Sequence, residues 1–217
     1  MNIAGMAKSS VVDYPGLISC VLFTPGCNYD CFYCHNRSLI DGSHHLINPH
    51  TVQTFLAQRT GLLDAVTISG GEPTLQPNLA TYIAFLKDMG YKVKLDTNGS
   101  SPHIISQLLL AGACDYFAVD FKAPPLRYRE VGGPKANPAN VLKTIQLLLQ
   151  AEVAFEVRST VLPCFSEADL LCIAQSLPVL PRYVLNRYRI PENFLPADYD
   201  RIRQKACSQE QINDLLP

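Results

Sequence analysis

The chain contains, at residues 27–34, the run Cys27-Asn28-Tyr29-Asp30-Cys31-Phe32-Tyr33-Cys34, which follows an apolar stretch at Leu17–Phe23. Its three cysteines are spaced as C-x3-C-x-aromatic-C, and so tight a grouping is typical of metal ligands. Three thiolates are one fewer than the four that usually hold a 4Fe-4S cluster. A cluster bound by this run would keep one iron free of protein ligands, and that iron would be open to chemistry.

A zinc site is the alternative for the same run. Structural zinc takes four nitrogen or sulfur ligands, and His35, next to Cys34, could supply the fourth. Adjacent residues rarely point at one tetrahedral ion. The spacing therefore favours an iron-sulfur cluster over zinc.

Length and composition limit the remaining possibilities. The 217 residues suit one domain over 1–217, with a core at about residues 15–190 and an irregular tail at 191–217. The 18 Lys and Arg nearly balance the 19 Asp and Glu, so the charge indicates neither a nucleic-acid partner nor a membrane partner. No apolar run is long enough to span a membrane, and Met1–Lys8 does not resemble a signal peptide, so we expect a cytoplasmic protein.

Five further cysteines lie outside the run. In a reducing compartment they are expected to be buried thiols rather than disulfides, and their spacing forms no second cluster pattern. They are Cys20, Cys114, Cys164, Cys172 and Cys207.

Strand and helix signals alternate along the chain. Apolar runs rich in β-branched residues predict strands at Leu17–Phe23, Ala65–Ile68, Lys92–Leu95, Tyr116–Val119, Val153–Val161 and Tyr183–Tyr188. Helical patterns lie between them, near Pro49–Arg59, Asn78–Met89, Pro102–Leu110, Pro138–Gln150 and Ser166–Leu177. This alternation predicts an α/β fold with parallel strands and right-handed connections, curled into a partial (β/α)6 TIM-like barrel.

Polar residues follow the first four predicted strands, which is where ligands bind in parallel α/β sheets. Besides the cysteine run, these segments are Ser69–Pro73, Asp96–Gly99 and Asp120–Lys122. The fifth predicted strand carries Glu156 and Arg158 within its apolar run, and the sixth carries Asn186, Arg187 and Arg189. Each segment also has a structural explanation. Gly70-Gly71 could form a simple turn, Glu72 could be a solvated loop acid, and Arg158 could pair with Glu156 on the same strand face.

Taken together, these residues resemble the radical S-adenosylmethionine (SAM) enzymes. The resemblance is carried by Phe23–Cys27 through Cys34-His35-Asn36-Arg37, and by Ser69–Pro73, Asp96–Gly99 and Asp120–Lys122. Within that superfamily the chain is most similar to the glycyl-radical-enzyme activases, especially those of anaerobic ribonucleoside-triphosphate reductase. The finer similarity lies in Ser10–Gly16 and Lys94–Ser100, and the resemblance extends to about Arg189.

The resemblance implies a role for each matching residue. Cys27, Cys31 and Cys34 would ligate three irons of a 4Fe-4S cluster, and SAM would chelate the fourth. The residues implied in SAM binding are Tyr33 and His35 beside the adenine, Gly70, Gly71 and Glu72 at the methionine amine, and Asp96, Thr97, Asn98, Asp120, Lys122 and Arg158 around the carboxylate and ribose. A monovalent cation is implied beside the acidic residues. Where related activases can place a His near adenosine, this chain has Tyr188.

The resemblance also implies an activity. One electron from the reduced cluster would cleave SAM, and the resulting radical would remove hydrogen from a glycine of a partner glycyl radical enzyme, with no general base or nucleophile beyond the cluster and SAM. The electron donor would be flavodoxin or ferredoxin, because no ferredoxin-like insertion is present. Two alternatives stay open: a radical SAM reaction on a small molecule, such as carboxy-deazaguanine synthesis, and a non-catalytic iron-sulfur or zinc protein.

Overall fold

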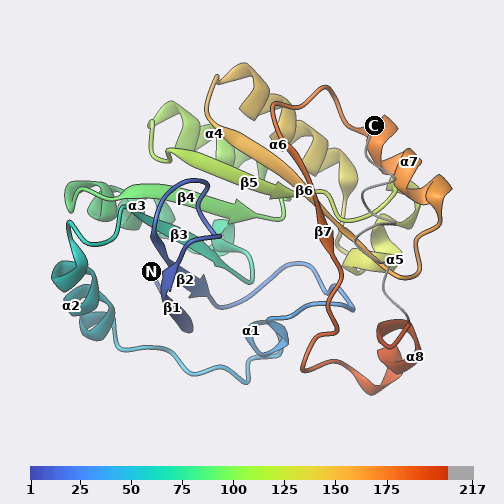
Figure 1. Ribbon diagram of the computed structural model, residues 1–217, viewed down its shortest axis with the longest axis horizontal. Coiled ribbons are helices and arrows are strands. Elements are labelled where there is room, and N and C mark those ends of the chain that lie inside the picture. Colours follow the sequence, from blue (N-terminus) through green and yellow to red (C-terminus); the bar gives the residue numbers. More distant parts are fainter. Residues whose placement is uncertain (205–217) are drawn as a thin grey trace.

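A seven-stranded sheet forms the centre of the molecule in a computed structural model that describes residues 1–204 (Figure 1). The strands follow one another across the sheet in chain order. They are β1 (Gly5–Ser10), β2 (Ser19–Thr24), β3 (Ala65–Gly70), β4 (Lys92–Thr97), β5 (Tyr116–Asp120), β6 (Phe155–Val161) and β7 (Tyr183–Arg187). β2 to β7 are parallel, as predicted, and their carboxyl ends therefore meet at one edge.

The sheet is open, because β1 and β7 lie at its two ends and do not pair with each other. β1 was not predicted, and it runs antiparallel to β2, with Gly5 opposite Phe23. Its sequence, Gly-Met-Ala-Lys-Ser-Ser, contains no β-branched or aromatic residue, so it carries no local strand signal. Pairing with β2 gives this segment its conformation.

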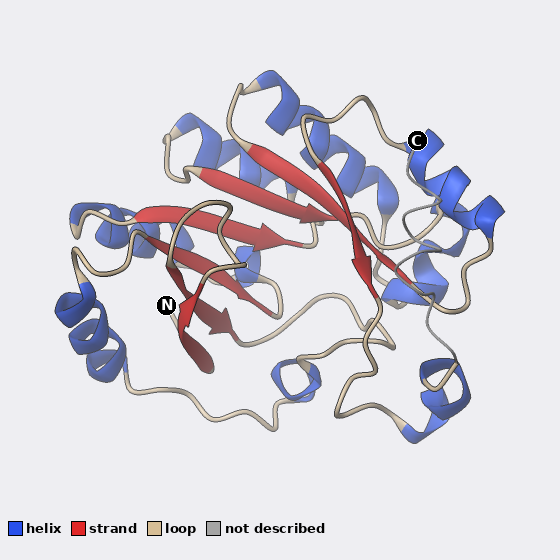
Figure 2. Cartoon of the chain, in the orientation of Figure 1, coloured by secondary structure: helices blue, strands red, loops and turns tan. Residues whose placement is uncertain are grey.

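All five predicted helices form, and Figure 2 shows them on the connections between strands. They are α2 (Pro49–Arg59), α3 (Leu79–Asp88), α4 (Pro102–Leu110), α6 (Pro138–Gln150) and α7 (Glu167–Ser176). Asn48 and Asn137 cap α2 and α6 by accepting hydrogen bonds from the amides of His50 and Ala139.

Several short helical turns were not predicted. They are α1 (Arg37–Asp41), α5 (Tyr128–Gly132), α8 (Tyr199–Ile202), and the 3-10 turns η1 (Pro73–Leu75), η2 (Pro125–Arg127) and η3 (Pro196–Asp198). The tail expected to be irregular after Pro191 thus contains η3 and α8. Elements of three to five residues leave too little periodicity to be read from sequence.

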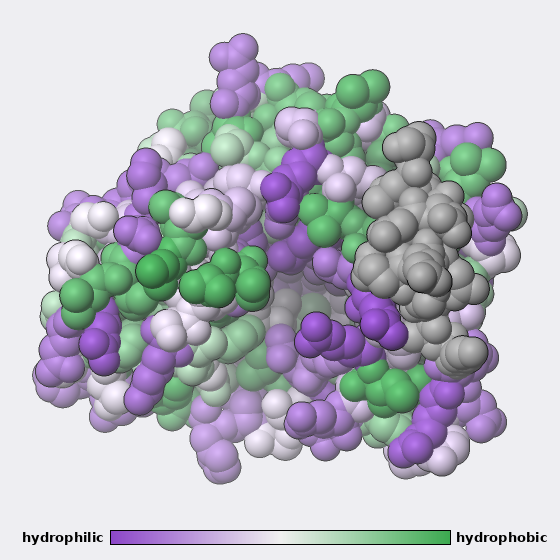
Figure 3. Space-filling model, viewed as in Figure 1, coloured by the Kyte–Doolittle hydropathy of each residue, from purple (hydrophilic) through white to green (hydrophobic). Residues whose placement is uncertain are grey.

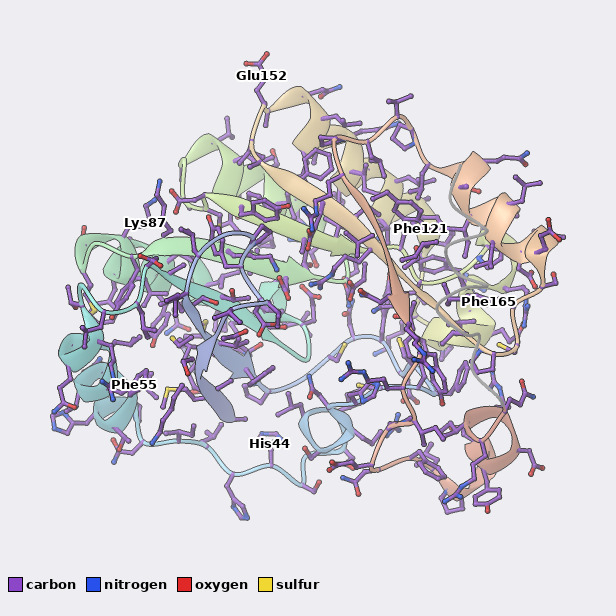
Figure 4. The ribbon with its side chains drawn as sticks, in the orientation of Figure 1. His44, Phe55, Lys87, Phe121, Glu152 and Phe165 are labelled. Atoms are coloured by element: carbon purple, nitrogen blue, oxygen red, sulfur yellow. The ribbon has the colours of Figure 1, made fainter. Side chains whose placement is uncertain are left out.

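The two faces of the sheet differ in chemistry. One face is apolar and packs against α3, α4 and α6, where Ile83, Ile105 and Ile145 are fully buried. Side chains alternate between faces along a strand, so the residues between the core positions point to the opposite, concave face. Phe121, labelled in Figure 4, illustrates this alternation: its ring centroid lies 5.3 Å from that of Tyr128. Its neighbours Asp120 and Lys122 instead line the cavity described below.

The expected state of the additional cysteines is partly confirmed. All four that lie among the described residues are free thiols; Cys20 and Cys114 are buried, whereas Cys164 and Cys172 are only partly buried. Cys207 lies outside the described residues. Within residues 1–204, no helix is long and apolar enough to cross a membrane.

Candidate functional site

A cavity of about 190 Å³ lies at the carboxyl ends of the parallel strands and gathers the predicted site residues. The molecular face shown in Figure 3 is hollowed near its centre. The predicted residues that line the cavity are Cys27, Cys31, Tyr33, Cys34, His35, Gly70, Gly71, Asp96, Thr97, Asn98, Asp120, Lys122 and Arg158. Glu72 is the predicted residue that does not line it.

The glycine pair holds the cysteine loop by close backbone contact. A Cβ on Gly71 would lie 2.0 Å from the carbonyl oxygen of Gly26, and one on Gly70 would lie 2.3 Å from the amide nitrogen of Thr24. The contact is fixed by hydrogen bonds from the Gly71 amide to Thr24 (2.9 Å) and from the Glu72 amide to Gly26 (2.7 Å). Glycine is therefore needed at positions 70 and 71 because the backbone of residues 24–26 occupies the space that a Cβ would fill. A simple turn would not impose this requirement.

The other side of the cysteine loop is anchored to α5. The Asp30 amide donates to the Gly132 carbonyl at 2.9 Å, and a Cβ on Gly133 would meet the Asp30 Cβ at 2.9 Å. Tyr29 is buried beneath the loop, and its hydroxyl accepts a hydrogen bond from the Asn137 amide at 3.4 Å. The cysteine run is thus tied both to the end of β3 and to α5.

The three thiols of the run sit on one wall of the cavity. Burial raises the pKa of Cys27 to about 11 and that of Cys31 to about 12, and it also raises the pKa of Cys34. The metal-free thiols are therefore protonated near neutral pH, and metal binding must release their protons. The Tyr29 amide donates to the Cys27 sulfur at 3.4 Å, and the Asn98 side-chain amide lies 3.9 Å from it.

The donors of the cavity fit a 4Fe-4S cluster by their chemistry, because three thiols line it and such a cluster takes one cysteine at each iron. Within the described part of the chain, no group of three His, Cys, Asp or Glu side chains is placed to hold a single metal ion. Burial lowers the pKa of His35, which lines the same cavity.

Glu72 is fully buried, so the interpretation as a solvated loop acid is wrong. Its carboxylate accepts hydrogen bonds from the Thr74 amide (3.1 Å), the Thr74 hydroxyl (2.6 Å), the Thr97 hydroxyl (2.7 Å) and the Asn98 amide (2.7 Å). Burial raises its pKa, although these donors oppose the shift. Glu72 thereby connects the loop after β3 to the loop after β4. Its contact with SAM stays a prediction.

A ladder of alternating charges crosses the concave face. It runs in the order Lys94, Asp96, Arg158, Asp120, Lys122. Arg158 donates to Asp96 at 3.1 Å and to Asp120 at 3.0 Å, and Lys122 lies 3.1 Å from Asp120. The alternative in which Arg158 pairs with Glu156 is wrong, because Arg158 pairs with Asp96 and Asp120 and Glu156 pairs with Arg182 at 2.9 Å.

The ladder controls the charge on the cavity wall. Burial opposes ionisation of Asp120, but the Lys122 and Arg158 charges outweigh it and lower the pKa of Asp120 to about 2. Burial likewise disfavours the charged form of Lys122, yet Asp120 holds its pKa well above the usual value. The ladder residues that line the cavity are two anions, Asp96 and Asp120, and two cations, Arg158 and Lys122, and these two cations suit a ligand carboxylate.

Sequence reasoning missed Lys94, whose side chain is 1% exposed and pairs with Asp96. A lysine inside an apolar strand was the available signal, because such a residue is rarely buried without a partner. Four residues that line the cavity were also not predicted as site residues, although they lie inside or beside the recognised motifs. They are Tyr29, Asn36, Ile40 and Ser69.

Tyr188 lies away from the cavity. It follows β7, is buried, and donates its hydroxyl hydrogen to the Ile202 carbonyl at 2.7 Å. Tyr188 therefore joins β7 to α8, and it does not line the cavity where SAM is expected.

Comparison with known proteins gives one family model, the Radical SAM superfamily, which matches residues 21–177. A protein of Methanocaldococcus jannaschii with the provisional name glycyl-radical enzyme activating enzyme is 33% identical over 86% of this chain and 79% of its own length. A protein of Pyrococcus horikoshii with the provisional name GTP 3′,8-cyclase is 30% identical, over 44% of this chain and 31% of its own length.

Solved structures show the same fold at low sequence identity. TYW1 with a bound lysine-pyruvate adduct has a TM-score of 0.61 at 18% identity, over 91% of this chain and 70% of its own. Streptococcus suis SuiB bound to S-adenosylmethionine has a TM-score of 0.62 at 16% identity, over 90% and 47% of the two chains. SuiB bound to its precursor peptide SuiA has a TM-score of 0.63 at 16% identity, over 90% and 43%.

The family model covers more than half of the chain, including the cysteine loop and the polar loops that follow β3, β4 and β5. Membership of this family implies a 4Fe-4S cluster and SAM, and the cavity offers three thiols and the side chains of Lys122 and Arg158 for them. The chain is therefore an enzyme that belongs to the radical SAM superfamily.

Proposed function

We propose that this enzyme activates a glycyl radical enzyme by removing a hydrogen atom from a glycine Cα, and that its target is anaerobic ribonucleoside-triphosphate reductase. The observation that carries the proposal is the 33% identity to the M. jannaschii protein over most of both chains. Similarity to the GTP 3′,8-cyclase protein covers less than half of this chain. The longer match supports a protein substrate.

When bound, the cluster and SAM would supply the one-electron reductive chemistry that removes a hydrogen atom from the glycine Cα. The chain contributes position and charge. Cys27, Cys31 and Cys34 would hold the cluster on the wall of the cavity. The glycine pair at 70 and 71 keeps that loop in place through its backbone contacts with Thr24 and Gly26.

The remaining cavity residues would orient SAM. Arg158 and Lys122 would attract its carboxylate, and Tyr33 and His35 would border its adenine. Gly70 and Gly71 would border the methionine amine, and Asp96, Thr97, Asn98 and Asp120 would surround the carboxylate and ribose. Glu72, which does not line the cavity, stays assigned to the amine by the family resemblance alone. The proposed monovalent cation would lie beside Asp96 and Asp120, and the electron donor would be flavodoxin or ferredoxin in the cytoplasm.

A test combines the anaerobically reconstituted enzyme with dithionite, SAM and purified anaerobic ribonucleoside-triphosphate reductase. We expect a glycyl doublet in the electron paramagnetic resonance spectrum and one 5′-deoxyadenosine for each radical formed. The matched control is Cys31→Ala, which should give neither product. SAM cleavage by the unmodified enzyme without a doublet on the reductase or other glycyl radical enzymes would favour the small-molecule alternative.

A further inference from the structure

Separate hollows that share lining residues form a groove between β7, the last strand of the sheet, and the cysteine cavity. Asn186 lines three of these hollows: one of about 720 Å³ along Asn186–Ile190, one of about 550 Å³ lined by the β1–β2 loop, and one of about 260 Å³ lined by Asp120. Arg158 lines the last two of these hollows and the cysteine cavity itself. An extended chain lying along β7 would therefore pass the entrance to the reaction site.

The outer edge of β7 carries backbone groups able to pair with such a chain. The Val157 amide donates to the Arg182 carbonyl at 3.1 Å, and Val157 lies opposite Tyr183. In a parallel ladder this register turns the backbone groups of residues 182, 184 and 186 toward β6 and those of 183, 185 and 187 outward. Within residues 1–204, no hydrogen bond reaches the amides or carbonyls of those three outward residues.

The walls of the groove indicate the chemistry of its occupant. Val11 and Val12, at the tip of the β1–β2 loop, are 75% and 84% exposed, and Ile190 at the other end is 53% exposed. Arg187 and Arg189 are exposed and form no ion pair with any described residue. This combination fits an extended segment with apolar side chains and acidic neighbours.

Exposed arginines can also protect a sheet edge from unwanted pairing. A purely protective edge would have no need to open onto the cavity through Asn186 and Arg158. We infer that β7 is the docking edge for the substrate protein, which adds an extended, acidic segment as a further strand and thereby delivers its glycine to the cavity. This inference rests on the proposed function and names how its substrate is recognised.

Leu185→Pro tests the backbone pairing. Proline removes one outward amide and leaves the ladder to β6 complete, and edge strands tolerate proline at such positions. With dithionite as the reductant, we expect the apparent KM for anaerobic ribonucleoside-triphosphate reductase to rise about tenfold or more, since each tenfold corresponds to about 1.4 kcal/mol. Leu185→Ala, which keeps the amide, is the matched control and should stay near the unmodified value.

Folding is checked by the thermal midpoint, and the intact site by SAM affinity and by SAM cleavage without the reductase, which Leu185→Pro should leave unchanged. A double charge reversal, Arg187→Glu with Arg189→Glu, provides a second test should the proline variant not fold. It should raise the apparent KM for the reductase and weaken the dependence of that KM on salt concentration. Its control reverses the charges of the exposed Lys135 and Lys143, which lie on other parts of the surface.

The outcomes separate the inference from the proposed function. A normal doublet with an unchanged KM in the folded Leu185→Pro variant, or in the double reversal, would overturn the docking edge and leave the proposed function standing. Absence of a doublet with the unmodified enzyme would overturn both. A defect seen only with flavodoxin as the reductant would show that the electron donor docks at β7. A change of oligomeric state in Leu185→Pro would show that a second copy of the chain docks there. Either result would overturn the inference.

Discussion

At the scale of single residues, the absence of a side chain at Gly71 has the most specific structural consequence. The carbonyl of Gly26 occupies the space that a Cβ would need, at 2.0 Å from its ideal position. The contact joins the end of β3 to the residue that precedes Cys27. Gly71 thus acts on the cysteine loop through the backbone, without offering any donor to a metal.

We predict that Gly71→Ala displaces the cysteine loop and lowers the iron content of the reconstituted protein. The overpacking should also reduce the free energy of unfolding by about 1–3 kcal/mol. The control is Gly90→Ala: Gly90 has a φ of 89° but no atom within 4 Å of an added Cβ. It should cost about 1–2 kcal/mol through backbone strain while retaining full iron content. Equal iron content in the two variants would refute the role given to Gly71.

At the scale of elements, β4, β5 and β6 present their charged residues to one another across the concave face. Asp96 on β4 and Asp120 at the end of β5 share Arg158 on β6, so the ladder spans three strands. Lys94 ends the ladder on the side away from the cysteine loop. Removing it would leave Asp96 with one cationic partner in place of two.

We therefore predict that Lys94→Met lowers the free energy of unfolding by about 3 kcal/mol, since a buried ion pair loses one member. Lys92→Met is the matched control on the same strand. The Lys92 side chain is 60% exposed and lies 3.5 Å from Asp115, so its loss should cost at most about 1 kcal/mol. Urea titrations of the iron-free proteins measure both values, and similar losses would show that the ladder adds no stability at Lys94.

At the scale of the whole molecule, parallel strands in chain order bring loops that are distant in sequence to one edge of the sheet. Asp96 and Arg158, for example, are 62 residues apart and form an ion pair. The open sheet leaves that edge accessible beside β7. The three motif cysteines are located at this edge, whereas the other described cysteines do not line the cavity.

Replacing the cysteines outside the motif should therefore leave cluster binding intact. We predict about four irons per chain when Cys20, Cys114, Cys164, Cys172 and Cys207 are changed together to Ala. Cys34→Ala alone should lose most of the iron while keeping its far-ultraviolet circular dichroism. Iron and sulfide assays give the result, and loss of the cluster in the first variant would show that a further cysteine is a ligand.

Much of the fold was predictable, because strong β and α signals alternate and proline or asparagine marks several helix starts. β1 was not predictable, since Gly5–Ser10 becomes a strand only through pairing with β2. The site residues were predictable to the extent that motifs follow strand ends. The partners of Glu72, Lys94 and Arg158 depend on register across strands, which no local pattern encodes.

The anchored cysteine loop also has a consequence for how the cluster is inserted. Hydrogen bonds to the carbonyls of Thr24, Gly26 and Gly132 fix the loop through protein groups that are not expected cluster ligands. We therefore expect cluster insertion to require little additional ordering of the chain, in contrast to small zinc domains that fold only around their metal. Protein stripped of iron by a chelator should then regain its cluster without passing through an unfolded state.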